Sequence, residues 1–254
     1  MDQSKQSQLT FAVMAKLTHL VHELLGLHLT KSQEDAFHYY EKELIRWNKH
    51  FNLTRILGSQ EILVQHFLDS LSCLIAIQKR ADKQATIQLV DVGSGAGFPG
   101  IPMAIICSDI NITLVESTEK KCTFMNQIVT ELKLSNARVL HDRAENLGQD
   151  YGHRERYDWA IARAVASLPV LAEYLLPLTR LSGYCLAQKT IMAKSELSQV
   201  TTALSELGGH LDHIVPVNLP GINETRHLIV MRKMSATPNK YPRRPGMPKK
   251  RPLL

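Results

Sequence analysis

The stretch VDVGSGAGFPGIP, from Val90 to Pro102, carries four glycines behind a short apolar run that ends in an acid. An apolar strand followed at once by glycines, and then by a second apolar run, is typical of a strand–turn–helix unit in an α/β protein. Glycine lets the backbone of such a turn approach a ligand closely. In open α/β sheets, ligands bind at the carboxyl ends of the strands. The stretch therefore predicts an α/β fold with a ligand at this turn.

The glycine spacing does not suit a dinucleotide. Counted from Gly93, the third glycine of the GxGxxG fingerprint falls on Phe98. Counted from Gly95, the fingerprint is complete, but Pro99 then lies in the turn and has no N–H for a pyrophosphate. With Asp91 the pattern becomes DxGxGxG, which resembles motif I of the S-adenosylmethionine-dependent methyltransferases. That cofactor carries no phosphate.

A second acid supports an adenosine-containing ligand. Glu116 ends the apolar run ITLVE, 23 residues after Gly93. An acid at this position accepts hydrogen bonds from ribose hydroxyls. NAD and S-adenosylmethionine both use such an acid, so Glu116 does not choose between them. The absence of phosphate donors in the loop favours S-adenosylmethionine.

Short apolar runs alternate with helical stretches from residue 86 onward. Strands are expected at seven segments: IQLVDVG, NITLVES, ARVLHD, YDWAIAR, GYCLAQK, LDHIVPV and RHLIVMRK. Helices at about 101–107, 119–132, 144–147 and 168–178 separate the first five, which predicts a mainly parallel sheet. The last two strands follow one another directly and predict a hairpin. Seven strands ending in such a pair resemble the class I methyltransferase architecture, which is Rossmann-like.

The chain divides into three regions. Residues 1–84 predict an N-terminal helical region, because apolar residues recur there at spacings of three and four. Residues 85–233 hold the expected methyltransferase domain. Residues 234–254 form a basic, proline-rich tail, which is not expected to fold alone.

Composition bounds the function classes. With 44% hydrophobic and 21% charged residues among 254, the chain has the make-up of a globular protein. No apolar run reaches the roughly 20 residues that a membrane helix needs, and no secretory leader is evident, so we expect a cytoplasmic protein. The four cysteines form no CxxC pair and are expected to be reduced and buried. The histidines show no metal-ligand spacing, so no metal is expected.

The excess positive charge lies in the tail. The net charge is +6, and the tail supplies six cations without an acid: Lys240, Arg243, Arg244, Lys249, Lys250 and Arg251. The rest of the chain is balanced, with 24 basic and 24 acidic residues. Charge alone leaves two interpretations open. The tail is either a solvated segment or an arm for nucleic-acid phosphates, in which Tyr241 could stack on a base.

Two missing motifs restrict the methyl acceptor. After the fourth strand the sequence reads ARAVASLP, without the Asn/Asp-Pro-Pro-aromatic motif of adenine-N6 methyltransferases. None of the cysteines follows a proline, as the nucleophile of RNA cytosine-C5 enzymes typically does. Both absences suit an acceptor that is already nucleophilic. Guanine N7 is one, because its lone pair carries no proton, so in-line positioning without a general base would suffice.

Several blocks together resemble one family. They are WNKHFNLTRI (47–56), HFLDSL (66–71), HDRAE (141–145), YDWAIARAVASL (157–168), RHLIVMRK (226–233) and the tail. With the glycine loop they resemble the bacterial 16S ribosomal RNA guanine-N7 methyltransferases, also called glucose-inhibited division protein B. The resemblance implies methylation of a guanine in the 530 loop by S-adenosylmethionine. It also implies 16S rRNA, the small ribosomal subunit or its assembly intermediate as the partner. We expect a monomer that is not bound to a membrane.

The resemblance also assigns residues. It implies cofactor contacts at Gly93, Phe98, Ala144, Glu145 and Arg163. Gly95 and Gly97 of the glycine loop, and Glu116 as the acceptor for the ribose, complete the expected cofactor-binding set. Arg163 could hold the carboxylate of the cofactor or donate to guanine O6. His66 and Asp69 are spaced i, i+3 on one helix face. They either form a helical salt bridge or, with Arg163, lie near the substrate.

RNA contacts are expected from Lys189, Arg226 and the six tail cations, since an enzyme that acts on folded RNA needs phosphate contacts. Two other functions stay open at this point. A non-catalytic ribosome-assembly factor could keep the fold and bind rRNA. An NAD-dependent oxidoreductase would use the same kind of sheet, although Phe98 and Pro99 oppose it.

Overall fold

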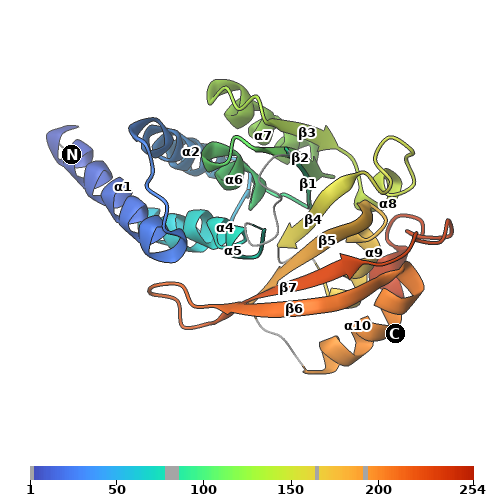
Figure 1. Cartoon of the computed structure of the whole chain (residues 1–254). Helices are drawn as coiled ribbons and strands as arrows, with labels where there is room; N and C mark the ends of the chain where they lie inside the picture. The colour runs from blue at the N-terminus through green and yellow to red at the C-terminus, as the bar shows by residue number, and fades with distance from the viewer. Residues whose placement is uncertain (1–2, 78–85, 164–165, 191–193) are drawn as a thin grey trace.

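The computed structural model describes residues 3–77, 86–163, 166–190 and 194–254 (Figure 1). Its centre is a seven-stranded sheet in the order β3-β2-β1-β4-β5-β7-β6. The strands are β1 (Ile87–Val92), β2 (Ile110–Glu116), β3 (Ala137–His141), β4 (Tyr157–Arg163), β5 (Thr179–Lys189), β6 (Gly209–Val217) and β7 (Arg226–Lys233).

The pairing of the strands confirms the predicted sheet. The first five strands run parallel to one another, whereas β7 is antiparallel to both β5 and β6. The strand order reverses between β1 and β4, and the glycine loop leaves the sheet at the end of β1. This is the topological switch point, where open α/β sheets bind their ligands.

Helices cover both faces of the sheet (Figure 1). The longer ones are α1 (Gln3–Leu25), α2 (Lys31–Asn48), α6 (Gly100–Ile106), α7 (Glu119–Glu131), α9 (Leu168–Leu175) and α10 (Lys194–Leu207). Helix α10 was not among the expected helices. Its buried residues Val200, Ala203, Leu204 and Leu207 stand at helical spacing, so the signal was present in the sequence. No helix in the described part of the chain is long and apolar enough to cross a membrane.

The N-terminal helices share a core with the sheet. Phe37 and Tyr40 of α2 belong to the same buried cluster as Leu89 of β1 and Ile112 of β2. The ring of Tyr40 also lies 5.3 Å from the ring of Phe98 in the glycine loop. The helical region therefore builds one wall of the ligand-binding edge. Its expected end at residue 84 lies outside the described residues.

The third helical segment is irregular. It begins with α3 (Ser59–Glu61), continues as a π-helix, η1 (Ile62–Leu68), and ends in the short helices α4 (Asp69–Leu71) and α5 (Leu74–Ile77). Wide π-helical turns occur frequently at functional sites. Here the π-helix carries His66 and leads directly into Asp69, two of the predicted site residues.

The tail is folded onto the domain and is not an extended arm. Its end forms the short helix α11 (Met247–Lys250). Tyr241 is only 4% exposed, and its hydroxyl donates to the carboxylate of Glu206, so it cannot stack on a base as proposed. Arg243 forms an ion pair with the fully buried Glu173 at 2.6 Å. A buried carboxylate needs such a partner, which explains why this cation turns inward.

Candidate active site

The glycine loop adopts backbone conformations that side chains disfavour. Gly93, Gly95 and Gly97 have φ values of 72°, 63° and 101°. A Cβ on Gly97 would lie 2.4 Å from the side chain of Ile101, so this glycine permits close packing. A Cβ on Gly95 would meet only a carbonyl oxygen at 4.0 Å, so this glycine borders open space. The loop thus needs glycine for two different reasons.

The amides of the loop are used within the protein. Hydrogen bonds to protein acceptors occupy the backbone N–H groups of Gly93, Ser94, Gly95, Gly97, Phe98 and Gly100. A phosphate-binding loop presents several free amides to its ligand. Pro99 has none, and the acids Asp91 and Glu116 accept two of these bonds. The loop therefore suits an uncharged adenosine and does not suit a pyrophosphate.

Glu116 ties the loop to the next helix. Its Oε2 accepts from the amide of Gly95 at 3.0 Å, and its Oε1 accepts from the amide of Thr118 at 2.9 Å. The residue is 7% exposed, and the Nζ of Lys121 lies 3.9 Å from Oε2. The carboxylate is thus fixed at the carboxyl end of β2. Its fixed position suits acceptance of hydrogen bonds from the hydroxyls of a ribose.

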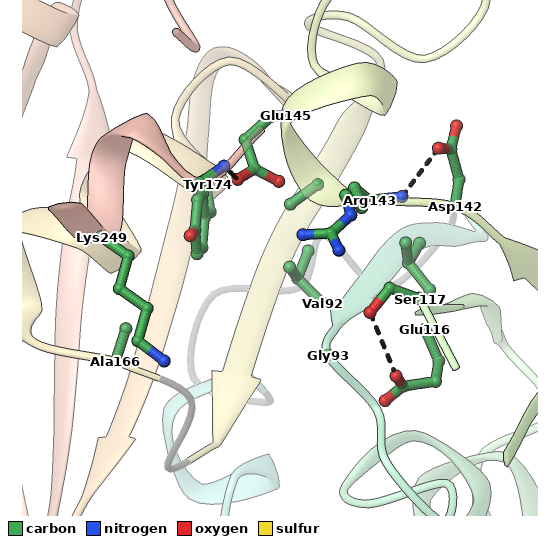
Figure 2. Close-up of a pocket in the computed structure, with 13 residues that line it drawn as sticks. Val92, Gly93, Glu116, Ser117, Asp142, Arg143, Glu145, Ala166, Tyr174 and Lys249 are labelled. Carbon is green, nitrogen blue, oxygen red and sulfur yellow. Dashed lines mark hydrogen bonds between the residues drawn. The ribbon is translucent and has the colours of Figure 1, made fainter. Parts of the chain in front are cut away.

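A cavity of about 250 Å³ lies beside the glycine loop (Figure 2). It brings together four of the predicted cofactor residues: Gly93, Glu116, Ala144 and Glu145. Gly95, Gly97, Phe98 and Arg163 are not among its lining residues.

Sequence reasoning missed several lining residues. Ser117 directly follows β2, and Asp142 and Arg143 directly follow β3, so the rule of carboxyl strand ends could have found them. Tyr174 from α9 and Gly246 from the tail carry no local signal. Only the tertiary fold brings them to the cavity.

Asp91 is a fully buried acid beneath the loop. Its Oδ2 accepts from the amide of Gly100 at 3.0 Å, whereas its Oδ1 has no partner among the described residues. Burial raises the pKa of Asp91 to about 7, against the lowering effect of the Gly100 amide. An unpartnered buried acceptor is costly unless a ligand or water satisfies it. A hydrogen-bond donor from a bound water or from a ligand would satisfy this oxygen.

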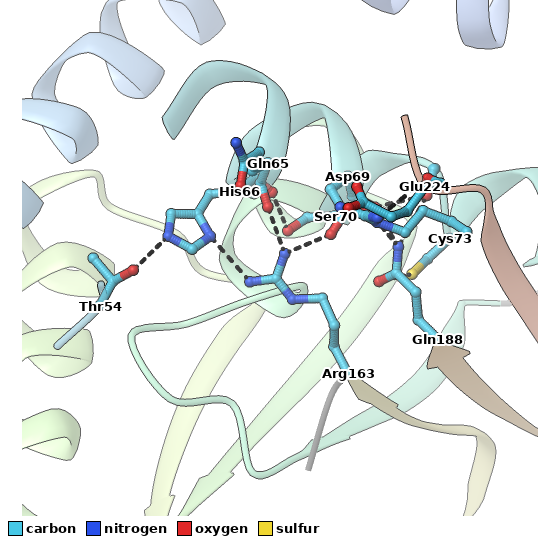
Figure 3. A network of polar contacts seen from close by, with 11 residues as sticks. Thr54, Gln65, His66, Asp69, Ser70, Cys73, Arg163, Gln188 and Glu224 are labelled. Atoms are coloured by element: carbon cyan, nitrogen blue, oxygen red, sulfur yellow. Dashed lines mark hydrogen bonds and ion pairs between the residues drawn. The ribbon is translucent and has the colours of Figure 1, made fainter. Parts of the chain in front are cut away.

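Arg163 contacts both of the other residues predicted to lie near the substrate, His66 and Asp69 (Figure 3). Its Nη1 donates to Asp69 Oδ2 at 3.0 Å and to the carbonyl of Gln65 at 3.1 Å. Its Nη2 donates to His66 Nδ1 at 3.3 Å, and its guanidinium carbon lies 5.1 Å from the ring centre of Phe98. Of the two interpretations of His66 and Asp69, the direct helical salt bridge is wrong, because Arg163 lies between the two side chains and bonds to both.

His66 is held neutral. Burial, and after it the positive charge of Arg163, lower its pKa to about 3. Because Nδ1 accepts from Arg163, the proton lies on Nε2 and is donated to the hydroxyl of Thr54 at 2.7 Å. The imidazole also stacks on Phe98. Both ring nitrogens are therefore occupied.

Two residues predicted to bind RNA have partners inside the protein. Arg226 is 7% exposed, and its Nε donates to Asp69 Oδ1 at 2.8 Å. The Nζ of Lys189 forms an ion pair with Glu196 at 2.8 Å. Asp69 needs cations because it is buried, and this requirement draws Arg226 inward. The prediction for Arg226 is thus corrected to a buried structural contact.

The tail cations fall into three groups. Lys240, Arg244, Lys250 and Arg251 are exposed. Arg243 forms an ion pair with Glu173. The prediction that Arg243 contacts RNA is therefore corrected to a structural ion pair within the protein. Lys249 lines the cavity beside the glycine loop.

The four cysteines are free and buried, as predicted. Within residues 3–77, 86–163, 166–190 and 194–254, no group of three or more His, Cys, Asp or Glu residues is arranged to hold a metal ion.

Comparisons with known proteins agree on one family. The family model described as "rRNA small subunit methyltransferase G" matches residues 33–229. A protein named ribosomal RNA small subunit methyltransferase G from Desulforamulus reducens is 44% identical over 225 residues, which cover 89% of this chain and 92% of that protein. Its namesake from Pelotomaculum thermopropionicum is 45% identical over 229 residues and covers 90% and 94%.

Solved structures agree on the fold. The 16S rRNA (adenine(1408)-N(1))-methyltransferase from Catenulisporales acidiphilia, solved with cosubstrate SAM, superposes with a TM-score of 0.51 at 14% identity and covers 61% of this chain and 89% of that one. TrmN from Thermus thermophilus has a TM-score of 0.50 at 16% identity and covers 68% and 53%. These likenesses confirm the predicted class I methyltransferase fold.

Proposed function

Because the chain belongs to the rRNA small subunit methyltransferase G family, we propose that it transfers a methyl group from S-adenosylmethionine to N7 of a guanine in the 530 loop of 16S rRNA. The observation that carries this proposal is the glycine loop. Its amides are bonded within the protein, while Glu116 stands fixed at the adjoining strand end. This combination suits an adenosine without phosphates and opposes the NAD-dependent alternative.

Different residues of the site would contact different parts of the cofactor. S-adenosylmethionine, when bound, would supply a methyl group on a sulfonium centre; in-line attack of a lone pair on that methyl carbon would break its C–S bond and leave the neutral thioether. Glu116 would accept from the ribose hydroxyls, and Ala144 and Glu145 would border the adenine. Asp91 Oδ1 would accept from the amino group of the methionine portion, directly or through a water. The ring of Phe98 would form the side of the site that faces Arg163.

Arg163 has donors left for a ligand. A guanidinium has five N–H groups, and the described contacts of Arg163 use three of them. The other two could reach the carboxylate of the cofactor or guanine O6. A planar pair of donors held in this way would orient either reactant, and this positioning is the contribution to the rate that we expect from Arg163.

The side chains near Arg163 suit an acceptor that needs no base. Both ring nitrogens of His66 are engaged in hydrogen bonds, and Asp69 forms ion pairs with two arginines. Neither is placed to take a proton from a substrate. Guanine N7 has no proton to lose, so the chemistry requires positioning and a matched polarity only.

RNA contact is proposed for exposed cations on the same side as Arg163. A surface pocket of about 850 Å³ is lined by Asn48, Lys49, Asn52, Arg55 and neighbouring residues, and no acid contributes to it. Thr54 from this pocket bonds to His66, which links the pocket to the site. The exposed tail residues Lys240, Arg244, Lys250 and Arg251 remain further candidates.

The proposal includes a soluble, monomeric enzyme in the cytoplasm whose partner is the small ribosomal subunit or its assembly intermediate. The first test is calorimetric titration of the protein with S-adenosylmethionine, beside a fluorescence titration with NADH. Binding of S-adenosylmethionine without binding of NADH is expected. Binding of NADH alone would favour an oxidoreductase, and binding of neither would favour a non-catalytic assembly factor.

A further inference from the structure

The tail contributes directly to the cavity beside the glycine loop. The amide of Gly246 donates to Oε1 of Glu145 at 2.8 Å, and Glu145 is 5% exposed. Gly246 and Lys249 both line the cavity. Figure 2 shows the side chain of Lys249 running from α11 toward Ala166, with Tyr174 beside it. Arg143 and Glu116 lie on the other side of the same cavity.

The segment just before Gly246 is anchored at several points. The guanidinium of Arg154 donates to the carbonyls of Thr237 and Tyr241, each at 2.7 Å. The side chain of Gln149 donates to the carbonyl of Pro242 at 2.9 Å. Arg243 holds Glu173 through both its backbone amide and its guanidinium. These bonds fix the chain direction before it reaches the cavity.

We propose that Gly246–Lys249 forms one wall of the adenosine site and that Lys249 is a cofactor-binding residue. This inference rests on the proposed S-adenosylmethionine site. The wall opposes Glu116 across the cavity, so it would close the site on the adenine side. The Lys249 ammonium would donate to an acceptor of the adenosine, either a ring nitrogen or a ribose oxygen.

The neighbouring Lys250 offers a matched comparison. Both lysines lie in the last turn of α11 and are exposed, but only Lys249 lines the cavity. If the tail cations act only on RNA phosphates, the two lysines should be equivalent. If Lys249 binds the cofactor, only its removal should weaken cofactor binding measured without RNA.

The test is calorimetric titration of Lys249→Ala and Lys250→Ala with S-adenosylmethionine and with S-adenosylhomocysteine. We expect the Kd of Lys249→Ala to rise about threefold to tenfold, the value of one lost hydrogen bond. The Kd of Lys250→Ala should equal that of the parent protein. Equal Kd values for both variants and the parent would overturn the inference, including the case in which Lys249→Ala weakens only RNA binding.

A truncation tests the wall as a whole. Ending the chain at Pro245 keeps the anchors at Thr237, Tyr241 and Arg243 but removes Gly246 and Lys249. We expect a Kd increase of about tenfold or more, and a smaller rise in Tm on adding S-adenosylmethionine. Ending the chain at Lys250 is the control and should bind like the parent.

The outcomes separate the two proposals. A parent protein that fails to bind S-adenosylmethionine contradicts the proposed function. A parent that binds it, with a truncated protein that is folded and binds it equally well, contradicts only the wall.

Discussion

The imidazole of His66 lies parallel to the ring of Phe98, with centroids 4.3 Å apart and an interplanar angle of 9°. His66 belongs to the N-terminal helical region, and Phe98 belongs to the glycine loop of the sheet domain. The same imidazole accepts from Arg163 at the end of β4. Two regions that are far apart in the sequence thus meet at one ring pair, and the geometry of the proposed methyl-transfer site depends on both.

Replacing Arg163 with lysine should reduce methyl transfer strongly. An ammonium keeps the charge beside Asp69 but cannot reproduce the planar fork that contacts Gln65, Asp69 and His66 together. We expect kcat to fall about 10- to 100-fold, as for the loss of one or two charge-assisted hydrogen bonds. Single-turnover methyl transfer at saturating S-adenosylmethionine measures this.

Arg226→Lys is the matched control. Arg226 contacts the other oxygen of Asp69 and is buried, whereas Arg163 also lies over the Phe98 ring of the glycine loop, so replacement of Arg226 should lower Tm more than kcat. Equal losses of kcat in the two variants would contradict a placement of Arg163 beside the reactants.

His66 should make stability depend on pH. Its pKa is about 3 in the folded protein, and an unperturbed histidine in the unfolded chain has a pKa of about 6.5. Between these two pKa values, His66 is protonated in the unfolded state and neutral in the folded state. Stability from this group is therefore complete above pH 6.5 and is lost as the pH falls, by about 1.4 kcal/mol per pH unit.

Denaturant unfolding between pH 6.5 and 4.5 tests this dependence, with His66→Asn as the comparison. The free energy of unfolding of the parent should fall more steeply toward acid than that of the variant, by the slope of one proton. Identical slopes would show that His66 is not held neutral.

Gly95→Ala should weaken cofactor binding beyond its effect on stability. Gly95 and Gly221 both have positive φ, at 63° and 72°, and neither would bring a Cβ closer than 4.0 Å to a neighbouring atom. Alanine should therefore cost each site about 1 kcal/mol of stability through the backbone.

Only Gly95 lies in the glycine loop, where its amide donates to Glu116; Gly221 lies in the turn between β6 and β7. We expect a Kd for S-adenosylmethionine at least about tenfold higher for Gly95→Ala, and no change for Gly221→Ala, since steric loss at a preformed site exceeds one hydrogen bond. Parallel calorimetry and thermal melting of the two variants check this. Equal Kd values would place the cofactor elsewhere.

Arg55→Glu should weaken binding of the RNA substrate and leave binding of the cofactor unchanged. Arg55 is exposed in the pocket that leads through Thr54 to His66. We expect KM for the small subunit to rise about threefold to tenfold and the salt dependence of binding to flatten by about one phosphate contact. Lys133→Glu is the control, because Lys133 is exposed in the turn before β3, at the amino ends of the strands and not at the carboxyl ends that carry the site. An equal effect of both variants would indicate a general charge effect.

The sheet was largely predictable, and the reason is local. Each strand is a short apolar run bounded by turn residues, so its pattern is visible without tertiary information. The ends of β1 and β2 likewise located Gly93 and Glu116. The π-helix was not predictable, because its extra residue per turn is set by packing of the surrounding helices.

Which charged side chains are buried in ion pairs was the least predictable feature. Arg226, Arg243 and Lys189 resemble any surface cation in sequence, and only the buried or partly buried acids Asp69, Glu173 and Glu196 explain why they turn inward. These partners lie far away in the chain, apart from Glu196. The same holds for the tail, whose composition predicts an extended arm and whose contacts instead bring it to the cavity.

The most direct measurement is transfer of a labelled methyl group from S-adenosylmethionine to small ribosomal subunits that lack the modification, followed by mass mapping of the RNA. We expect one methyl group per subunit, on N7 of a guanine in the 530 loop. A methyl group on another base, or no transfer by a protein that binds S-adenosylmethionine, would contradict it.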